Sequence, residues 1–249
     1  MIYIVTAVLD GMPWIATHYH NFTKLKQDWE WHIVEGVSAN IADTGWCSTQ
    51  SPRLSVDGTS EYLEFLAGLD TRVHYYSSKL WRGKTEQLNS AIRHFKEDGY
   101  LLQVDADELW TAPQIERACS LLGKRNCAFF RCKFYLGPDI ITSGYGTWGN
   151  RTDTEWLRLW KYRAGQEFIT HEPPRLTSMI MDPVPHDETE RAGLVFEHRA
   201  YATESQVLFK EKYYNEPGLL EGWHQLQQNS QWPTSAEPFI GKDTIATRL

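Results

Sequence analysis

Three carboxylates crowded at the end of an apolar segment are the first candidates for chemistry in this sequence. Asp105, Asp107 and Glu108 follow the run Leu101–Val104, which predicts a buried strand that ends at a rim of the fold. Like charges this close repel one another, so a divalent cation would stabilise them, and oxygen ligands suit Mg²⁺ or Mn²⁺. Such a metal usually completes its coordination with substrate phosphates. The pattern predicts a metal and diphosphate site; the alternative is a solvated acidic turn before a helix at Pro113.

The elements that must position these carboxylates alternate between strand and helix in the N-terminal half. Apolar runs predict strands at Ile2–Leu9, His32–Val37, Val73–Tyr76, Tyr100–Val104 and Ala128–Leu136. Helical spacing and capping residues predict helices that begin near Pro13, at Thr59 or Ser60, at Lys84 (through Glu97) and at Pro113. This alternation predicts a mostly parallel, doubly wound sheet. Ligands of such sheets bind beyond the carboxyl ends of the strands, where Asp105 and Asp107 are expected.

The second half of the chain is less regular. It contains a glycine- and aromatic-rich segment at 137–150 and a strand pattern at Glu155–Tyr162. Thr203 and Gln206 form a capping-box signature for a helix through Tyr214, and the tail from Trp223 onward is weakly patterned. Because there is neither an internal repeat nor a linker, the sequence favours one domain over residues 1–249.

Composition limits the classes of partner. The chain has 249 residues, 41% of them hydrophobic, and a formal net charge of −7, which argues against nucleic acid as a partner. None of its four cysteines forms a Cys-x-x-Cys pair, so we expect a reduced, cytoplasmic protein without structural zinc. The first residues have the pattern of a strand, not a signal peptide, and no apolar run predicts a transmembrane segment.

Four segments occur in an informative order: Ile4–Val8, His32–Gly36, Gly83–Ala91 and the Asp105-Ala106-Asp107 motif. Together they cover about the first half of the chain and resemble the GT-A glycosyltransferases, in particular the large inverting family-two type. The resemblance implies an α/β, Rossmann-like fold with a mostly parallel central sheet flanked by helices. It implies a metal-dependent inverting enzyme that moves a sugar from a UDP- or GDP-sugar to a hydroxyl of a glycan, lipid-linked or protein acceptor. Residues 1–136 would bind the nucleotide sugar and residues 137–249 the acceptor.

The resemblance assigns the base and ribose contacts to the ends of the first two strands, at Ala7, Val8 and Glu35. A carboxylate such as Glu35 can accept hydrogen bonds from ribose hydroxyls or from a base N–H. The relatives usually carry paired aspartates where this chain has Glu35 and Gly36. The alternative for Glu35 is a strand end that faces solvent.

The remaining donor contacts lie at the start of the central helix and in the acidic motif. A helix N-terminus attracts anions, Lys84 adds a cation, and Gln87 can reach a base or a sugar hydroxyl. In the family, the second carboxylate of the motif usually binds the metal, which implies Asp107. Asp105 would reach the ribose or the donor sugar beside Ala106, or contact the metal directly or through water.

A late histidine often completes this site in GT-A enzymes. His198 is the better candidate, because it follows an apolar strand and precedes a capped helix, whereas His186 lies in an irregular acidic segment. Imidazole is an acceptable partner for Mn²⁺, so the implied cofactor is Mn²⁺ or Mg²⁺. Lys210 and Lys212 are expected to be solvated, with phosphate contacts as the alternative.

Inverting transfer is a single displacement that needs a base for the acceptor hydroxyl. Related enzymes carry this carboxylate well after the metal motif, which implies Glu172 in the segment His171-Glu172-Pro173-Pro174. Asp153 and Glu155 are the competing candidates. Aromatic side chains stack on sugar rings, and an acceptor platform is predicted from Tyr145, Trp148 and Trp156.

Two other function classes remain open. A nucleotidyltransferase acting on sugar phosphates would normally carry a glycine-rich basic loop after the first strand, and the segment Asp10–Pro13 is not such a loop. A phosphatase of the Asp-x-Asp-x-Thr type is excluded because Leu109 occupies the threonine position. The eleven tryptophans suggest a non-catalytic carbohydrate-binding protein, which the βαβ organisation disfavours.

Overall fold

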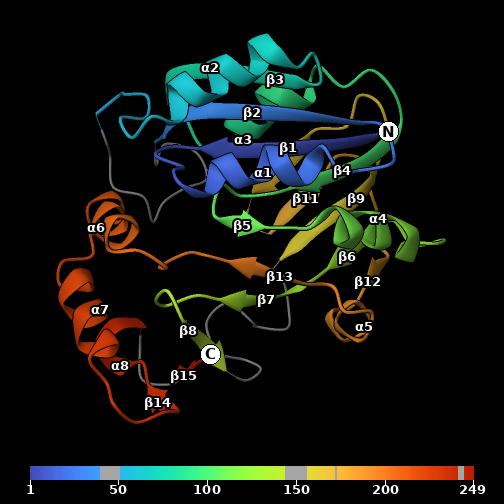
Figure 1. Ribbon diagram of the computed structural model, residues 1–249. Coiled ribbons are helices and arrows are strands. Elements are labelled where there is room, and N and C mark those ends of the chain that lie inside the picture. The colour runs from blue at the N-terminus through green and yellow to red at the C-terminus, as the bar shows by residue number, and fades with distance from the viewer. Residues whose placement is uncertain (40–50, 144–155, 172, 241–243) are drawn as a thin grey trace.

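The computed structural model describes residues 1–39, 51–143, 156–171, 173–240 and 244–249. Its largest sheet has seven strands in the order β12-β6-β9-β4-β1-β2-β3 (Figure 1). These strands are β1 (Ile2–Val8), β2 (Trp29–Ser38), β3 (Val73–Trp81), β4 (Gly99–Gln103), β6 (Cys127–Phe129), β9 (Leu157–Tyr162) and β12 (Pro183–Val184). The pairs β4–β1, β1–β2 and β2–β3 are parallel, and β9 runs antiparallel to both β4 and β6. The predicted α/β fold with a mostly parallel central sheet is confirmed.

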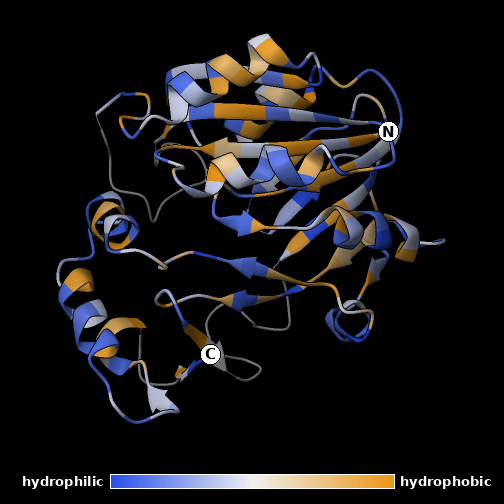
Figure 2. Ribbon diagram, viewed as in Figure 1, coloured by the Kyte–Doolittle hydropathy of each residue, from blue (hydrophilic) through white to orange (hydrophobic). Residues whose placement is uncertain are grey.

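Helices cover both faces of this sheet, and its central strand β1 is buried along nearly all of its length (Figure 2). The side chains of Ile2 and Ile4 lie in one hydrophobic cluster and those of Tyr3 and Val5 in another, as alternation along a strand requires. The first cluster includes residues of α1 (Trp14–Phe22), α2 (Thr59–Leu69) and α4 (Ala112–Leu121). The second includes residues of α3 (Lys84–Ile92) and of the hairpin β10 (Phe168–His171) and β11 (Pro174–Leu176).

Two predicted elements have different bounds in the structure. The strand expected at Ala128–Leu136 is two strands, because the chain leaves the central sheet at Phe130 and continues as β7 (Arg131–Phe134). β7 pairs with β13 (Val195–His198), which also pairs with β5 (Glu108–Leu109). A strand pattern in the sequence does not indicate where a chain changes sheets. The helix expected through Glu97 ends at Ile92, although Phe95 beyond it is still buried.

Most of the chain after residue 194 forms a second, C-terminal layer below the central sheet in Figure 1, whereas β9 and β12 belong to the central sheet itself. The capping-box prediction is confirmed: Thr203 caps α6 (Glu204–Tyr213) with Gln206. The weakly patterned tail is structured. It contains α7 (Leu219–Gln227), β14 (Thr234–Ser235), α8 (Glu237–Ile240) and β15 (Ile245–Arg248), and β15 pairs with β8 (Ile140–Ser143); the short helix α5 (His186–Arg191) lies earlier.

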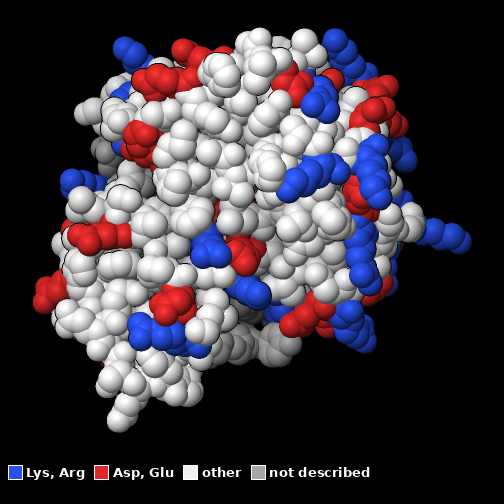
Figure 3. All heavy atoms as spheres, in the orientation of Figure 1, with Lys and Arg blue, Asp and Glu red and all other residues white. Residues whose placement is uncertain are grey.

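Charged side chains are distributed over the face of the molecule in Figure 3, with acidic and basic groups interspersed. The net charge of −7 is therefore not gathered in a single acidic patch on this face. Among the described residues, none of the helices is long and apolar enough to cross a membrane.

Candidate functional site

A cleft with a volume of about 1000 Å³ lies between the carboxyl ends of the parallel strands and the C-terminal layer. Its lining combines residues that are far apart in the sequence. It includes these predicted site residues: Ala7, Val8, Lys84, Gln87, Asp105, Ala106, Asp107, Trp156 and His198. Glu35 is not among the lining residues, and Glu172, Tyr145 and Trp148 lie outside the described residues.

Glu35 is the predicted donor contact that the structure buries. Its carboxylate accepts hydrogen bonds from the Ser55 amide at 2.8 Å, from the Ser60 hydroxyl at 2.6 Å and from the Tyr75 hydroxyl. It thereby ties the segment after residue 50 to β2. The alternative of a solvent-facing strand end is wrong, because the residue is 0% exposed.

Gly36 explains the departure from paired aspartates at this position. Its φ is +130°, and a Cβ atom would stand 1.7 Å from the carbonyl oxygen of Ser78. An aspartate could not occupy this site without moving β3, because the strained conformation and the missing space both require glycine.

Two polar side chains of α3, Gln87 and Asn89, form hydrogen bonds with the backbone of β2 and β10. Gln87 donates from Nε2 to the Val34 carbonyl at 3.0 Å, which secures the middle of β2. Asn89 forms two hydrogen bonds with the backbone of Phe168, at 2.9 and 2.8 Å, and so anchors β10. β10 ends at His171, which lines the cleft. Lys84 lies at the first position of α3 and presents its charge to the same cleft.

Asp105 belongs to a buried ion-pair group centred on Arg158 of β9. The Arg158 guanidinium contacts the Asp105 carboxylate at 3.1 Å and the fully buried Glu108 carboxylate at 2.6 Å. Burial alone would raise the pKa of Asp105, but the cations of Arg158 and Lys84 lower it to about 2. Asp105 is therefore ionised, and Arg158 determines where its carboxylate points. The pKa of Glu108 is raised by burial, against the opposing effect of Arg158.

Asp107 lies between two groups from the C-terminal layer. Its Oδ1 is 3.3 Å from His198 Nε2 and its Oδ2 is 3.0 Å from Lys210 Nζ. Burial opposes the charge, but Lys210 and His198 hold the pKa of Asp107 well below its usual range. The expectation that Lys210 is solvated is wrong, because its ammonium group is directed at the acidic motif from α6.

The donor atoms around Asp107 fit a divalent cation. A carboxylate oxygen and an imidazole nitrogen 3.3 Å apart can share one ion, and both are accepted by Mn²⁺. Among the described histidines, cysteines and carboxylates, no third ligand completes a compact cluster here. The other coordination positions would therefore be filled by water or by substrate oxygens, as is usual for Mg²⁺ and Mn²⁺ sites next to phosphates.

Several residues of the site were not assigned from the sequence. His18 of α1 is fully buried, and burial lowers its pKa to about 4. The neutral ring therefore donates from Nε2 to the Ala106 carbonyl at 3.0 Å. This hydrogen bond holds the backbone of the acidic motif in place. Burial, with Lys84 adding to it, lowers the pKa of His171 to about 3. The sequence contains a pattern that could have identified Arg158: a cation between Leu157 and Leu159 in an apolar strand indicates a buried anion as its partner.

The central part of the chain, residues 54–181, matches the model of glycosyl transferase family 2. The chain belongs to this family. The matched segment is about half of the chain and contains the acidic motif, α3 and β9. The predicted family and enzyme class, a GT-A glycosyltransferase, are therefore confirmed. Among curated proteins, no sequence matches the chain.

Partial similarity is found to solved structures of S. aureus TarS. The chain is 11% identical to TarS 1-349, with a TM-score of 0.41, and the match covers 64% of this chain and 46% of that one. The complex of TarS 1-349 with UDP gives 11% identity, a TM-score of 0.42 and the same coverage. The complex with UDP-GlcNAc gives 10% identity and a TM-score of 0.41, with 64% and 45% covered. The match thus spans less than half the length of these structures.

Proposed function

We propose that this member of glycosyl transferase family 2 is a metal-dependent, inverting enzyme that uses a UDP- or GDP-sugar. The acceptor is a hydroxyl of a glycan, a lipid-linked sugar or a protein. One observation carries the proposal: Asp105 and Asp107 follow the central strand β4 and line the large cleft, and the cations of Lys84, Arg158 and Lys210 lie close to them. Ionised carboxylates between cations form a site for a metal and a pyrophosphate, which carry opposite charges.

The donor would lie across the carboxyl ends of β1, β2 and β4. Ala7 and Val8 line the cleft where the base and ribose are expected, and Lys84 offers its cation to a phosphate at the start of α3. Gln87 supports this side through the backbone of β2. Asp107 and His198 would hold the metal, with Asp105 beside it. When bound, a divalent cation neutralises the charge that develops on the departing diphosphate.

A carboxylate of the chain would act as the base that accepts the proton of the acceptor hydroxyl. In a single displacement, the acceptor oxygen bonds to the anomeric carbon as the diphosphate departs, and a carboxylate accepts the hydroxyl proton. We assign this role to Glu172, because its neighbours His171 and Pro173 line the cleft and Asn89 anchors β10 just before it. Trp156 lines the cleft with its ring edge-on to His198, and we assign it to the acceptor platform. The assignment of Tyr145 and Trp148 to the same platform rests on the sequence alone.

The test is a panel of nucleotide sugars, monitored by donor hydrolysis and by melting temperature, with and without Mn²⁺ or Mg²⁺. We expect one UDP- or GDP-sugar to be hydrolysed slowly and to raise the melting temperature only with metal present. Release of pyrophosphate from a nucleoside triphosphate and a sugar phosphate would indicate a nucleotidyltransferase instead. Stabilisation by free sugar alone would indicate a carbohydrate-binding protein.

The role of Glu172 has its own test. Glu172→Gln should abolish transfer while donor binding stays nearly unchanged, because only proton transfer is removed. Lost donor binding with normal turnover at saturation would exclude Glu172 as the base. Single-domain organisation and a cytoplasmic location stay predictions of the sequence.

A further inference from the structure

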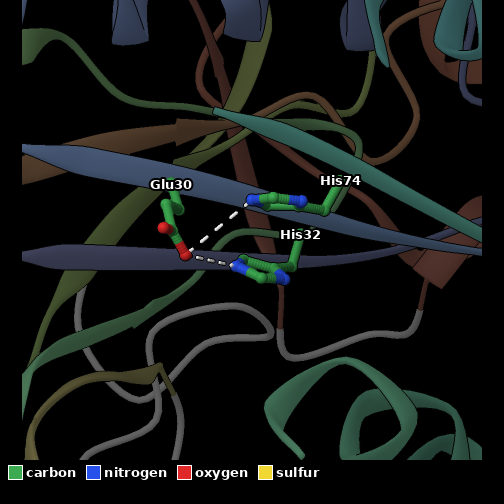
Figure 4. A group of neighbouring side chains, drawn as sticks. All are labelled: Glu30, His32 and His74. Carbon is green, nitrogen blue, oxygen red and sulfur yellow. Dashed lines mark hydrogen bonds and ion pairs between the residues drawn. The ribbon is translucent and has the colours of Figure 1, made fainter. Parts of the chain in front are cut away.

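Three potential metal ligands meet at the end of the central sheet opposite the cleft (Figure 4). Glu30 and His32 are two residues apart on β2, so they share one face of the sheet. In the parallel pairing of β2 with β3, His74 is the direct partner of His32. The backbone register therefore brings two imidazoles and a carboxylate together. The cleft-lining residues Gly36 and Ser38 lie four to six residues further along β2, roughly 13–20 Å away.

The ligand atoms have the spacing that a small cation requires. Glu30 Oε2 lies 3.1 Å from His32 Nε2 and 3.8 Å from His74 Nε2, and all three ligand atoms are within 4.8 Å of one another. Ligands held about 2.0–2.1 Å from a tetrahedral Zn²⁺ stand about 3.3–3.4 Å apart. The two rings stack with their centroids 4.4 Å apart, so both nitrogens already face Glu30.

The polar atoms of this cluster are incompletely satisfied. Within the described part of the chain, the Nε2 of His74 is buried and has no hydrogen-bond partner. A buried polar atom without a partner is unfavourable, and coordination to a cation would give this nitrogen a partner. No lysine or arginine among the described residues forms an ion pair with Glu30, so its charge is available to an ion.

The ring of His32 has a polar partner at each nitrogen. Its Nε2 lies 3.1 Å from Glu30 Oε2. Its Nδ1 is 3.2 Å from the hydroxyl of Tyr76. When Nε2 binds a cation, the ring proton resides on Nδ1 and can be donated to the Tyr76 oxygen. Such outer hydrogen bonds orient the histidine ligands of many metal sites.

We propose that Glu30, His32 and His74 form a second cation site, specific for zinc or a similar borderline divalent ion, that links the first halves of β2 and β3. Two imidazoles and one carboxylate form a common three-ligand set for zinc, whereas Mg²⁺ prefers oxygen ligands. The side chains of Glu30 and His74 are 32% and 35% exposed, so water can complete the coordination. The inference does not depend on the proposed sugar-transfer activity.

The test is a titration of the metal-stripped full chain with Co²⁺, which replaces zinc and absorbs visible light strongly in a tetrahedral site. Asp107→Asn removes the cleft site, so it should retain the absorption at one Co²⁺ per chain. In that background, His74→Gln should weaken Co²⁺ binding about 100-fold or more, since even outer-sphere partners contribute 10–100-fold. His20→Gln, an exposed histidine on α1, is the matched control and should bind normally.

A second variant protects the test against misfolding. Glu30→Gln changes a partly exposed side chain and should weaken Co²⁺ binding in the same way, with circular dichroism confirming the fold. Three results would overturn the proposal: no tetrahedral absorption from the unaltered chain, equal Co²⁺ affinity in His74→Gln, or loss of the absorption in Asp107→Asn alone.

Discussion

The two ends of the central sheet carry the same ligand types in opposite electrostatic surroundings. At the carboxyl ends of the strands, Asp107 and His198 lie in a large cleft with Lys210 against the carboxylate. At the other end, Glu30 contacts His32 and His74, and the described residues supply no lysine or arginine to it. Carboxylate and imidazole alone therefore do not define what a site binds.

The difference teaches how surrounding charge selects a ligand. Against burial, cations lower the pKa of Asp105 to about 2, so the cleft holds ionised carboxylates next to positive side chains. In such a site the carboxylates can bind a metal while the positive side chains bind a pyrophosphate. Around His32, burial favours the neutral imidazole, which suits a single borderline cation. One end is equipped to bind and release a charged substrate, and the other to hold an ion that joins two strands.

The largest effect is expected when the cleft loses its central carboxylate. Asp107→Asn should lower kcat/KM for sugar transfer about 1000-fold, because a charge-stabilising group at the departing diphosphate is lost. The measurement is steady-state transfer or donor hydrolysis at saturating Mn²⁺. Asp187→Asn, which changes an exposed aspartate on α5, is the control. More than a tenth of the activity remaining in Asp107→Asn would contradict the proposed site.

A second prediction concerns stability at the cleft. Arg158→Gln leaves the buried Glu108 and Asp105 without their cation, and it should lower the free energy of unfolding by about 3–5 kcal/mol. Urea denaturation measures this loss. Arg191→Gln breaks an exposed pair with Asp187, so it should cost no more than about 0.5 kcal/mol. Equal losses in the two variants would show that Arg158 does not neutralise buried charge.

The pH dependence of stability tests the other end of the sheet. The pKa of His32 is about 3 in the folded protein and about 6.5 when unfolded, so below pH 6.5 only the unfolded chain takes up this proton. The free energy of unfolding therefore falls as the pH drops from 6.5 towards 3. His32→Gln should make this fall shallower by up to about 1.4 kcal/mol per pH unit in urea titrations between pH 6.5 and 5, with the full difference reached towards pH 5. If His32→Gln had the same pH slope of the free energy of unfolding as the exposed control His20→Gln, His32 would not be held neutral in the folded protein.

The smallest effect is expected from the hydrogen bond behind His32. Tyr76→Phe removes the hydroxyl next to Nδ1 and should weaken Co²⁺ or Zn²⁺ binding about tenfold without changing the number of ions bound. Calorimetric titration of the metal-stripped chain measures it. Sugar transfer should stay normal, because Tyr76 does not line the cleft. A joint loss of ion binding and transfer would show that the two ends are coupled.

Local patterns predicted most of the N-terminal half. Leu88, Ala91 and Ile92 form the buried face of α3 at helical spacing, and the apolar run before Asp105 is β4. The patterns failed where the chain changes partners. Phe130 lies within one predicted strand but separates β6 in the central sheet from β7 in another. Periodicity reports which side of an element is buried, and it carries no information on which strand lies next to it.

The sequence by itself indicated that Asp105 and Asp107 follow a buried strand, because a short apolar run that stops at charged residues is typical of a strand that leaves the core. Only the tertiary structure decided what surrounds them. Arg158 comes from an antiparallel neighbour and Lys210 from a helix about 100 residues later in the chain. Likewise, His74 meets His32 through strand register. Charges this distant in sequence interact only after the sheet order has brought them together, since Coulomb energy depends on separation in space.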